Sequence, residues 1–142
     1  MIATDKVGDL IGMVKKKSSV YKTAPWGVIN QADFLNQVLN IETALDPESL
    51  LDQIHWIEEQ LGRIRMNKWE ARLIDIDILF YDHEIIATSR LTIPHPYISQ
   101  RRFALEPLNE IASGLMHPVL KKKIKQLLKE CTDTSSVTRT IL

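Results

Sequence analysis

Residues 73–81 read LIDIDILFY, and this stretch decides the fold because apolar and acidic side chains alternate strictly from residue 74 to residue 78. Successive side chains of a strand point to opposite faces, so the isoleucines would form a buried ridge and Asp75 and Asp77 would share the other face, roughly 7 Å apart. Mg²⁺ prefers one or two carboxylates together with phosphate oxygens and water. The pattern predicts a strand over residues 73–81 that presents a platform for a metal-bound nucleotide. A solvated strand face with two ordinary acids explains the alternation equally well.

A basic segment, residues 62–72, precedes this strand and carries Arg63, Arg65 and Arg72 with a single acid among them. One guanidinium group can donate two parallel hydrogen bonds to phosphate oxygens. Arginines beside an acid pair therefore indicate phosphoryl chemistry. The alternative is that Arg63 and Arg65 only complement the negative end of the preceding helix. Trp69 has few apolar neighbours in this segment, which suggests contact with a planar ligand or a partner. A lid residue packed on the surface is the simpler interpretation.

The preceding helix has a recognisable start and end. Asp46 is a capping carboxylate, Pro47 suits the first helical position, and Glu48 lies near the positive end of the dipole. Gly62 suits the C-terminal stop. The apolar residues recur at intervals of four, three and four and should form one buried stripe: Leu50, Ile54, Ile57 and Leu61.

The remaining elements are expected to be strands over Met13–Thr23 and Phe34–Thr43 with a long loop between them, a short strand over residues 84–88 that pairs with residues 73–81 after a turn at 81–83, and a helix over Leu120–Lys129. The tail after Cys131 is expected to fray. We find no repeat or linker, so the 142 residues should form a single domain.

Composition narrows the function classes. The chain is 44% hydrophobic and 25% charged, and its 18 basic and 18 acidic residues cancel, so neither nucleic acid nor an anionic membrane is an expected partner. No run approaches about 20 apolar residues, and no secretory signal is evident, so we expect a cytoplasmic protein. A single cysteine, Cys131, cannot form an internal disulfide.

Two further groups of residues are candidates for ligand contacts. In Thr92–Pro96 (TIPHP) the two prolines restrict the backbone around His95, which could then bind a phosphate or an adenine edge; a lone histidine in a turn is more often structural. Phe34 and Asn36 share a strand face and offer a ring for stacking and an amide for the edge of a heterocycle, although a core position is the simpler interpretation of Phe34. Arg101 and Phe103 follow closely after His95.

Taken together, these segments resemble a known family. RIRMNKWEARLIDIDILFYD (63–82), with SVYKTAPWG (19–27), DFLNQV (33–38) and LTIPHPYISQRRF (91–103) in the same order, is similar to the 6-hydroxymethyl-7,8-dihydropterin pyrophosphokinases. The resemblance extends from about Met13 to Pro118. It implies an α+β, ferredoxin-like fold, with a largely antiparallel sheet flanked by helices, and transfer of pyrophosphate from ATP to the pterin in folate biosynthesis.

The resemblance also assigns roles to individual positions. It implies that Asp75 and Asp77 bind two Mg²⁺ ions. We further hypothesise that Asp77, or a metal-bound state of the hydroxyl, assists deprotonation. Arg63, Arg72 and Asp77 would be catalytic. The implied ATP-binding positions are Leu51, Glu58, Arg65, Ile78, His95 and Arg101. The implied pterin-binding positions are Thr23, Trp26, Phe34, Asn36, Trp69 and Phe103, with the rings of Phe34 and Phe103 sandwiching the substrate.

The sequence departs from the family at its start and in one loop. Family members open with a hydrophobic strand, a Gly-Ser-Asn turn and most of a helix, so we expect residues 1–11 to be the tail of that helix and the first strand to be missing from this chain. Glu70 and Ala71 stand where Gly-Pro is usual. Two alternatives stay open: an inactive remnant that binds nucleotide or a protein partner, and a two-metal phosphoesterase. A monomer or weak dimer is expected.

Overall fold

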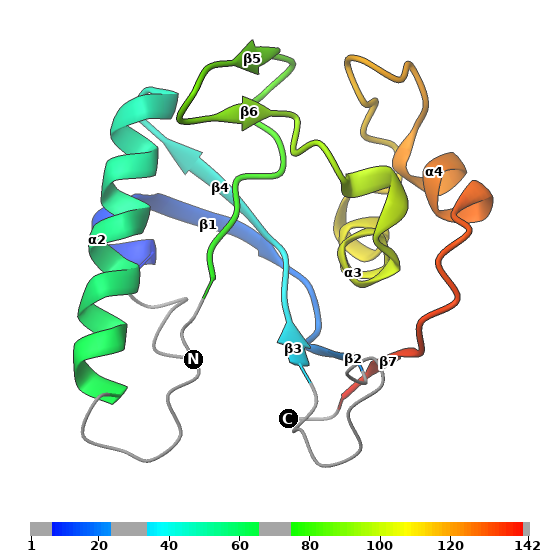
Figure 1. Ribbon diagram of the computed structural model, residues 1–142, viewed down its shortest axis with the longest axis horizontal. Coiled ribbons are helices and arrows are strands. Elements are labelled where there is room, and N and C mark those ends of the chain that lie inside the picture. The colour runs from blue at the N-terminus through cyan, green and yellow to red at the C-terminus, as the bar shows by residue number, and fades with distance from the viewer. Residues whose placement is uncertain (1–6, 24–33, 66–74, 141–142) are drawn as a thin grey trace.

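A computed structural model of the chain describes residues 7–23, 34–65 and 75–140, without the side chains of residues 63–65. It shows short antiparallel sheets flanked by helices, which confirms the α+β class (Figure 1). Residues 7–10 are helical. The further elements are β1 (Gly12–Lys17), β2 (Tyr21–Thr23), β3 (Phe34–Asn36), β4 (Leu39–Thr43), α2 (Pro47–Arg65), β5 (Ile86–Ala87), β6 (Thr92–Ile93), η1 (Ile98–Gln100), α3 (Arg102–Ala112), α4 (Ile124–Glu130) and β7 (Val137–Arg139). The ferredoxin-like topology stays a prediction.

The two strands predicted over Met13–Thr23 and Phe34–Thr43 form one antiparallel hairpin that is broken in the middle. β1 pairs with β4, and β2 pairs with β3. Between the two halves the buried Ser18 takes over the pairing: Val38 N donates to its Oγ (2.9 Å), and its own N donates to the Val38 carbonyl (2.9 Å). A side chain that satisfies backbone groups in this way lets the hairpin bend without leaving buried donors unpaired.

Helix α2 begins as predicted. Ser49 N donates to the Asp46 Oδ1 at 2.7 Å, so the carboxylate caps the helix, and this bond is the main reason that the pKa of Asp46 is lowered. The predicted apolar stripe is also confirmed. The predicted end at Gly62 is wrong, because the helix continues to Arg65. Glycine inside a helix costs only about 1 kcal/mol, and here it does not provide the left-handed stop.

Residues 75–81 are extended but form no strand, so the prediction of a ladder-paired strand over 73–81 is wrong for its described part. Its hydrogen bonds go instead to a loop and a side chain: His95 N donates to the Leu79 carbonyl (3.0 Å), and Ile76 N donates to the Glu58 carboxylate (2.9 Å). The predicted alternation is nevertheless confirmed, since Asp75 and Asp77 are exposed while Ile76 and Ile78 are partly buried.

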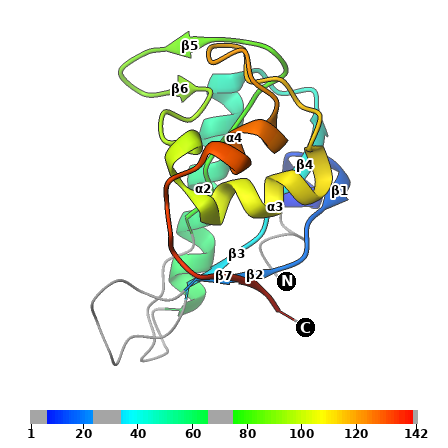
Figure 2. The same ribbon diagram turned by 90° about the vertical axis from the view of Figure 1, so that its right-hand side faces the viewer.

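Three other predictions need correction. β5 pairs with β6 rather than with residues 73–81, because a four-residue turn fixed by Thr88 brings Ile86 opposite Ile93. α4 starts at Ile124 instead of Leu120. The tail does not simply fray, because β7 joins β2 in a β3–β2–β7 sheet that α3 covers (Figure 2). Helix α3 was not anticipated; its first N–H is capped by Asp133, 31 residues away.

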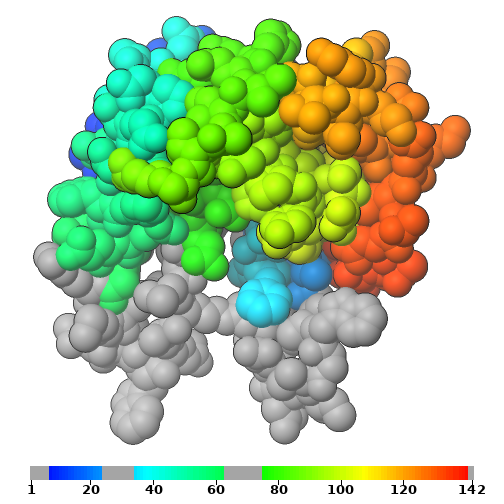
Figure 3. Space-filling model, turned by 45° about the horizontal axis from the view of Figure 1, so that its top comes forward, coloured from blue at the N-terminus to red at the C-terminus, as the bar shows by residue number. Residues whose placement is uncertain are grey.

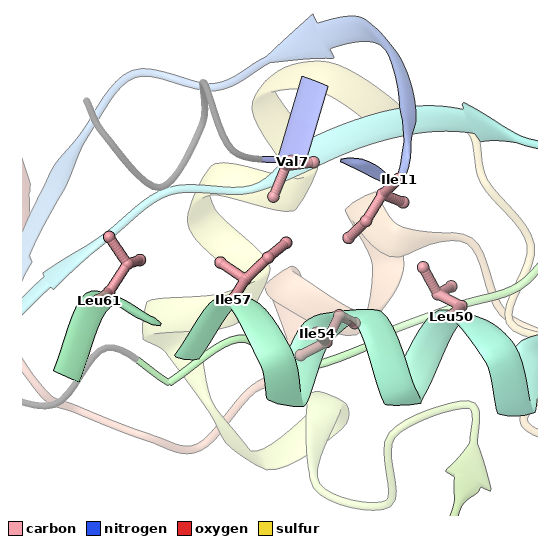
Figure 4. Close-up of a cluster of buried hydrophobic side chains, with 6 residues drawn as sticks. All are labelled: Val7, Ile11, Leu50, Ile54, Ile57 and Leu61. Carbon is pink, nitrogen blue, oxygen red and sulfur yellow. The ribbon is translucent and has the colours of Figure 1, made fainter. Parts of the chain in front are cut away.

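Two hydrophobic clusters form the core. The first contains the α2 stripe with Val7 and Ile11 above it (Figure 4), and the second lies between α3 and α4. On the face drawn in Figure 3, the blue-green surface of α2, the green segment after it and the orange surface of the later part of the chain lie next to one another. Within the described residues, no helix has the length and apolar character needed to span a membrane.

Candidate active site

A cleft of about 310 Å³ lies between α2, residues 75–78 and the chain from Arg90 to Pro96. Its walls contain six residues that the sequence indicated as site residues: Leu51, Glu58, Asp75, Asp77, Ile78 and His95. They come from three parts of the chain that lie far apart in sequence. A carboxylate pair, an imidazole and apolar side chains therefore share one solvent-accessible cavity.

The two aspartates are held by the packing of their neighbours. Ile76 and Ile78 pack against the first hydrophobic cluster, and Asp75 and Asp77, which alternate with them along the chain, line the cleft. Both of these acidic residues are exposed. Such oxygens suit a hard cation whose remaining ligands are phosphate and water. Among the described residues, no group of three or more His, Cys, Asp or Glu side chains is arranged to hold a metal ion.

Glu58 fixes the backbone between the aspartates. Its side chain extends from α2, and its Oε2 accepts a 2.9 Å hydrogen bond from Ile76 N, the amide between Asp75 and Asp77. A charge-assisted bond of this kind is worth more than a neutral one. The resemblance indicated Glu58 only as a neighbour of the nucleotide; its hold on the acid-bearing segment could not be foreseen, because that segment was expected to bond along a sheet.

His95 is half-buried at the opposite wall. Burial lowers its pKa below the ordinary value; the Asp77 carboxylate acts in the opposite sense and the Arg101 guanidinium in the same sense. Its Nδ1 accepts a hydrogen bond from Tyr97 N at 3.3 Å, so the neutral ring carries its proton on Nε2. His95 is therefore suited to donate a hydrogen bond to a phosphate oxygen without itself being charged.

Arg101 connects this wall with a group of aromatic rings. Its guanidinium carbon lies 5.0 Å from the centre of the Tyr97 ring and 5.7 Å from that of Phe103, which are cation–π distances. Stacking of this kind limits where the cation can point. It also places a permanent positive charge between the cleft and the first turn of α3, which carries Phe103.

A second group of predicted residues lies on the β2–β3 pair. Thr23 is directly opposite Phe34, and directly opposed side chains of antiparallel strands share a face. Asn36 lies two residues along the same strand and shares that face too. Phe34 is 47% exposed although it is a large apolar ring, whereas Thr23 is buried and its Oγ1 has no hydrogen-bond partner among the described residues. An exposed ring beside an unsatisfied hydroxyl suits a flat, polar ligand.

Five of the predicted residues cannot be placed. Trp26, Trp69 and Arg72 lie outside the described residues, as do the side chains of Arg63 and Arg65 at the end of α2. Six cleft residues were not predicted as site residues: His55, Ile76, Arg90, Leu91, Thr92 and Pro96. His55 had a usable signal, because it lies midway between Leu51 and Glu58 at helical spacing. Arg90 had none; its ion pairs with Glu48 (2.9 Å) and Asp52 (2.6 Å) span 42 and 38 residues.

Comparison with known proteins agrees with this geometry. A family model described as 7,8-dihydro-6-hydroxymethylpterin-pyrophosphokinase matches residues 2–113. The 2-amino-4-hydroxy-6-hydroxymethyldihydropteridine pyrophosphokinase of Aquifex aeolicus is 43% identical over 119 residues, which are 84% of this chain and 74% of that protein. The enzyme of the same name from Haemophilus influenzae is 46% identical over 116 residues, 82% of this chain and 72% of its own length. The folic acid synthesis protein fol1 of Pneumocystis carinii is 38% identical over 120 residues, 84% of this chain but 16% of that protein. The chain belongs to the 7,8-dihydro-6-hydroxymethylpterin-pyrophosphokinase family.

Proposed function

We propose that this protein transfers the pyrophosphoryl group of ATP to the hydroxymethyl group of 6-hydroxymethyl-7,8-dihydropterin, giving AMP and the pterin diphosphate for folate biosynthesis. The observation that carries the proposal is the cleft in which Asp75, Asp77 and His95 meet. Phosphoryl transfer needs alignment and charge neutralisation more than covalent help from the protein, and this set of groups offers both.

In the reaction, the pterin hydroxyl oxygen attacks the β-phosphorus of ATP, the bond from that phosphorus to the bridging oxygen of AMP breaks, and AMP leaves in line. Asp75 and Asp77 are the residues that would hold two Mg²⁺ ions, which would neutralise the charge that develops on the phosphates. Asp77 is also the candidate acceptor of the hydroxyl proton. His95 donates from Nε2 to a phosphate oxygen, and Arg101 supplies a fixed positive charge.

The two substrates would occupy neighbouring sites. Leu51, Glu58 and Ile78 line the cleft assigned to ATP. Thr23, Phe34 and Asn36 on the sheet, with Phe103 on α3, are assigned to the pterin, and Arg101 stands between the two sites. Arg63, Arg65, Arg72, Trp26 and Trp69 keep their expected roles as phosphate and pterin contacts. A single domain, a monomer or weak dimer and a cytoplasmic location remain part of the proposal.

The test is the rate of AMP formation with the pterin, ATP and Mg²⁺. Asp77→Asn keeps the shape of the side chain but removes its charge. The variant would lose a proton acceptor and a charged metal ligand, so kcat should fall by about 100-fold or more. Near-normal turnover of this variant with saturating Mg²⁺ would exclude the role given to Asp77.

A matched control lies on the same chain segment. Asp82→Asn makes the same change five residues later, where the backbone φ of 50° is one that asparagine also adopts readily. This variant should keep normal activity. The inactive-remnant alternative is not favoured; it would require the unaltered chain to bind ATP and form no AMP. A phosphoesterase would release phosphate in the absence of the pterin.

A further inference from the structure

Glu110 of α3 joins three elements through one carboxylate. Its Oε1 accepts a 2.7 Å hydrogen bond from the Tyr21 hydroxyl, and Ser19 N, just before β2, lies 3.1 Å from both carboxylate oxygens. The Ser19 hydroxyl donates to Oε2 at 3.2 Å. Arg139 of β7 lies 3.4 Å from Oε1 and donates to the Tyr21 hydroxyl at 3.2 Å. We call Glu110, Tyr21, Ser19 and Arg139 the Glu110 network.

The Glu110 network lies on the sheet face that carries the residues assigned to the pterin. Tyr21 is directly opposite Asn36 on one side and Arg139 on the other, and Thr23 is directly opposite Phe34. Side chains directly opposed in antiparallel strands, and those two residues apart along a strand, share a face. This face is the one turned toward α3, because the Tyr21 hydroxyl reaches Glu110, and Figure 2 shows α3 lying over the β3–β2–β7 sheet. The residues that share the face are Tyr21, Thr23, Phe34, Asn36 and Arg139.

The same helix supplies the other wall of this site. Phe103 and Glu110 are seven residues apart on α3, which is two helical turns and about 10 Å along one side of the helix. The distance between Phe34 and Phe103 thus depends on how α3 is seated on the β3–β2–β7 sheet. The hydrogen bond from the Tyr21 hydroxyl to Glu110 makes this network a direct polar connection between α3 and β2.

We propose that the Glu110 network positions the pterin-binding face, with Glu110 as the positioning residue that sets α3 against Tyr21 and, through it, against Thr23 and Asn36. This inference rests on the proposed function. Although burial raises the pKa of Glu110, hydrogen bonds from Tyr21 and Ser19 outweigh it, so the pKa lies below the ordinary value and the carboxylate is charged at neutral pH. Burial, and next the bond to Glu110, raise the pKa of Tyr21, so its hydroxyl keeps the proton that it donates.

The members of the Glu110 network should contribute unequally. Tyr21 is 5% exposed, so its hydrogen bond to the carboxylate of the exposed residue Glu110 is partly shielded from water and is the stronger part of the network. The Arg139 side chain is 59% exposed, and exposed ion pairs contribute little. Tyr21→Phe and Glu110→Gln are therefore the informative changes, and Arg139→Ala should have a smaller effect in the same direction.

The experiment measures kcat and the KM of each substrate separately. Glu110→Gln and Tyr21→Phe should each raise the KM for the pterin by about tenfold, while the KM for ATP and kcat change by less than about twofold. The dissociation constant of the pterin, titrated with a non-hydrolysable ATP analogue and Mg²⁺ present, should rise in parallel. Both variants remove the same hydrogen bond. The loss of pterin-binding free energy in the double variant should therefore be smaller than the sum of the losses in the two single variants.

Glu106→Gln is the matched control. Glu106 is one turn earlier on α3 and pairs with Arg102 of the same helix at 3.2 Å, so this change removes an ion pair without touching β2. It should leave both KM values unchanged.

Equal increases of both KM values in Glu110→Gln, or a lower melting temperature with normal KM values, would refute the positioning role. Should Glu110→Gln fail to fold, Tyr21→Phe decides alone, since it only removes a hydroxyl. An unaltered chain that binds pterin but forms no AMP refutes the proposed function and leaves the binding test valid; one that binds no pterin refutes both.

Discussion

At the scale of single residues, Gly12 shows how backbone proximity constrains the sequence. A Cβ built on Gly12 would lie 2.1 Å from the Glu42 carbonyl oxygen and 3.0 Å from Thr43 Cα, and both are backbone atoms. Neither can move aside as a flexible side chain could. The β1–β4 pair therefore requires glycine at the position opposite Thr43, where the chain leaves the helical residues 7–10.

We predict that Gly12→Ala lowers the free energy of unfolding by about 1–3 kcal/mol, the usual range for an overpacked site, as measured by urea denaturation. Gly8→Ala is the matched control. Its Cβ would meet nothing within 4 Å, and Gly8 lies among helical residues, so stability should stay the same or rise by up to about 1 kcal/mol. Equal losses in both variants would show that the close approach at Gly12 is not the cause.

Residue types were the most predictable part of the site. Asp75, Asp77 and His95 could be predicted as candidate site residues from local pattern and from the resemblance. The alternation of the acids and the prolines that flank His95 each lie within a few neighbouring positions of the sequence. Glu110 could not. Its partners Ser19 and Tyr21 are 91 and 89 residues away, so no local pattern distinguishes it from Glu106 on the same helix.

At the scale of elements, a helix or strand could be predicted from the sequence when the interactions that define it lie within one short segment. Helix α2 was predictable because its cap, first-turn proline and apolar stripe all lie within one segment. β7 was not, because a strand of three residues is defined by a partner, here β2, that lies more than a hundred residues earlier. Residues 75–81 show the converse: a perfect strand pattern forms no strand when its backbone groups are bonded to Glu58 and His95 instead of a ladder.

The turn between α3 and α4 depends on the protonation state of His117. This histidine is 6% exposed, and its Nδ1 accepts hydrogen bonds from Val119 N (3.2 Å) and Leu120 N (3.0 Å). Protonation of Nδ1 would convert the acceptor into a donor facing two donors. Burial lowers the pKa of His117 below 6.5, so the neutral form is favoured in the folded state.

The pKa of His117 is lower in the folded state than in the unfolded state. The contribution of neutral His117 to the free energy of unfolding is therefore complete above about pH 6.5 and is lost as the pH falls toward the folded-state pKa. We predict that the melting temperature falls between pH 7.5 and 5.5, and that His117→Asn, whose amide oxygen can accept without titrating, falls less over this interval. His83→Asn, at an exposed turn position, is the control and should keep the pH dependence of the unaltered chain. An unchanged slope in His117→Asn would assign the pH dependence to other groups, such as His95.

At the scale of the whole molecule, one extended segment connects the two cores. Ile76, Ile78 and Tyr81 pack against the first cluster, while Leu79 and Phe80 pack against the second. The site aspartates belong to this same segment. Loss of either cluster should therefore release the residues that hold the acid pair, so the two halves are expected to unfold together as a single domain.

A matched pair of substitutions tests this coupling. Ile57 in the first cluster and Ile124 in the second are both 0% exposed, and replacing either with alanine should cost about 2–5 kcal/mol. In native-state hydrogen exchange, we predict that Ile124→Ala reduces the protection of the slowest α2 amides as much as that of the α3 amides, and that Ile57→Ala does the same in reverse. If each substitution affected only the helices of its own cluster, the chain would consist of two independently unfolding units, and the acid pair would lie on the hinge between them rather than inside one cooperative domain.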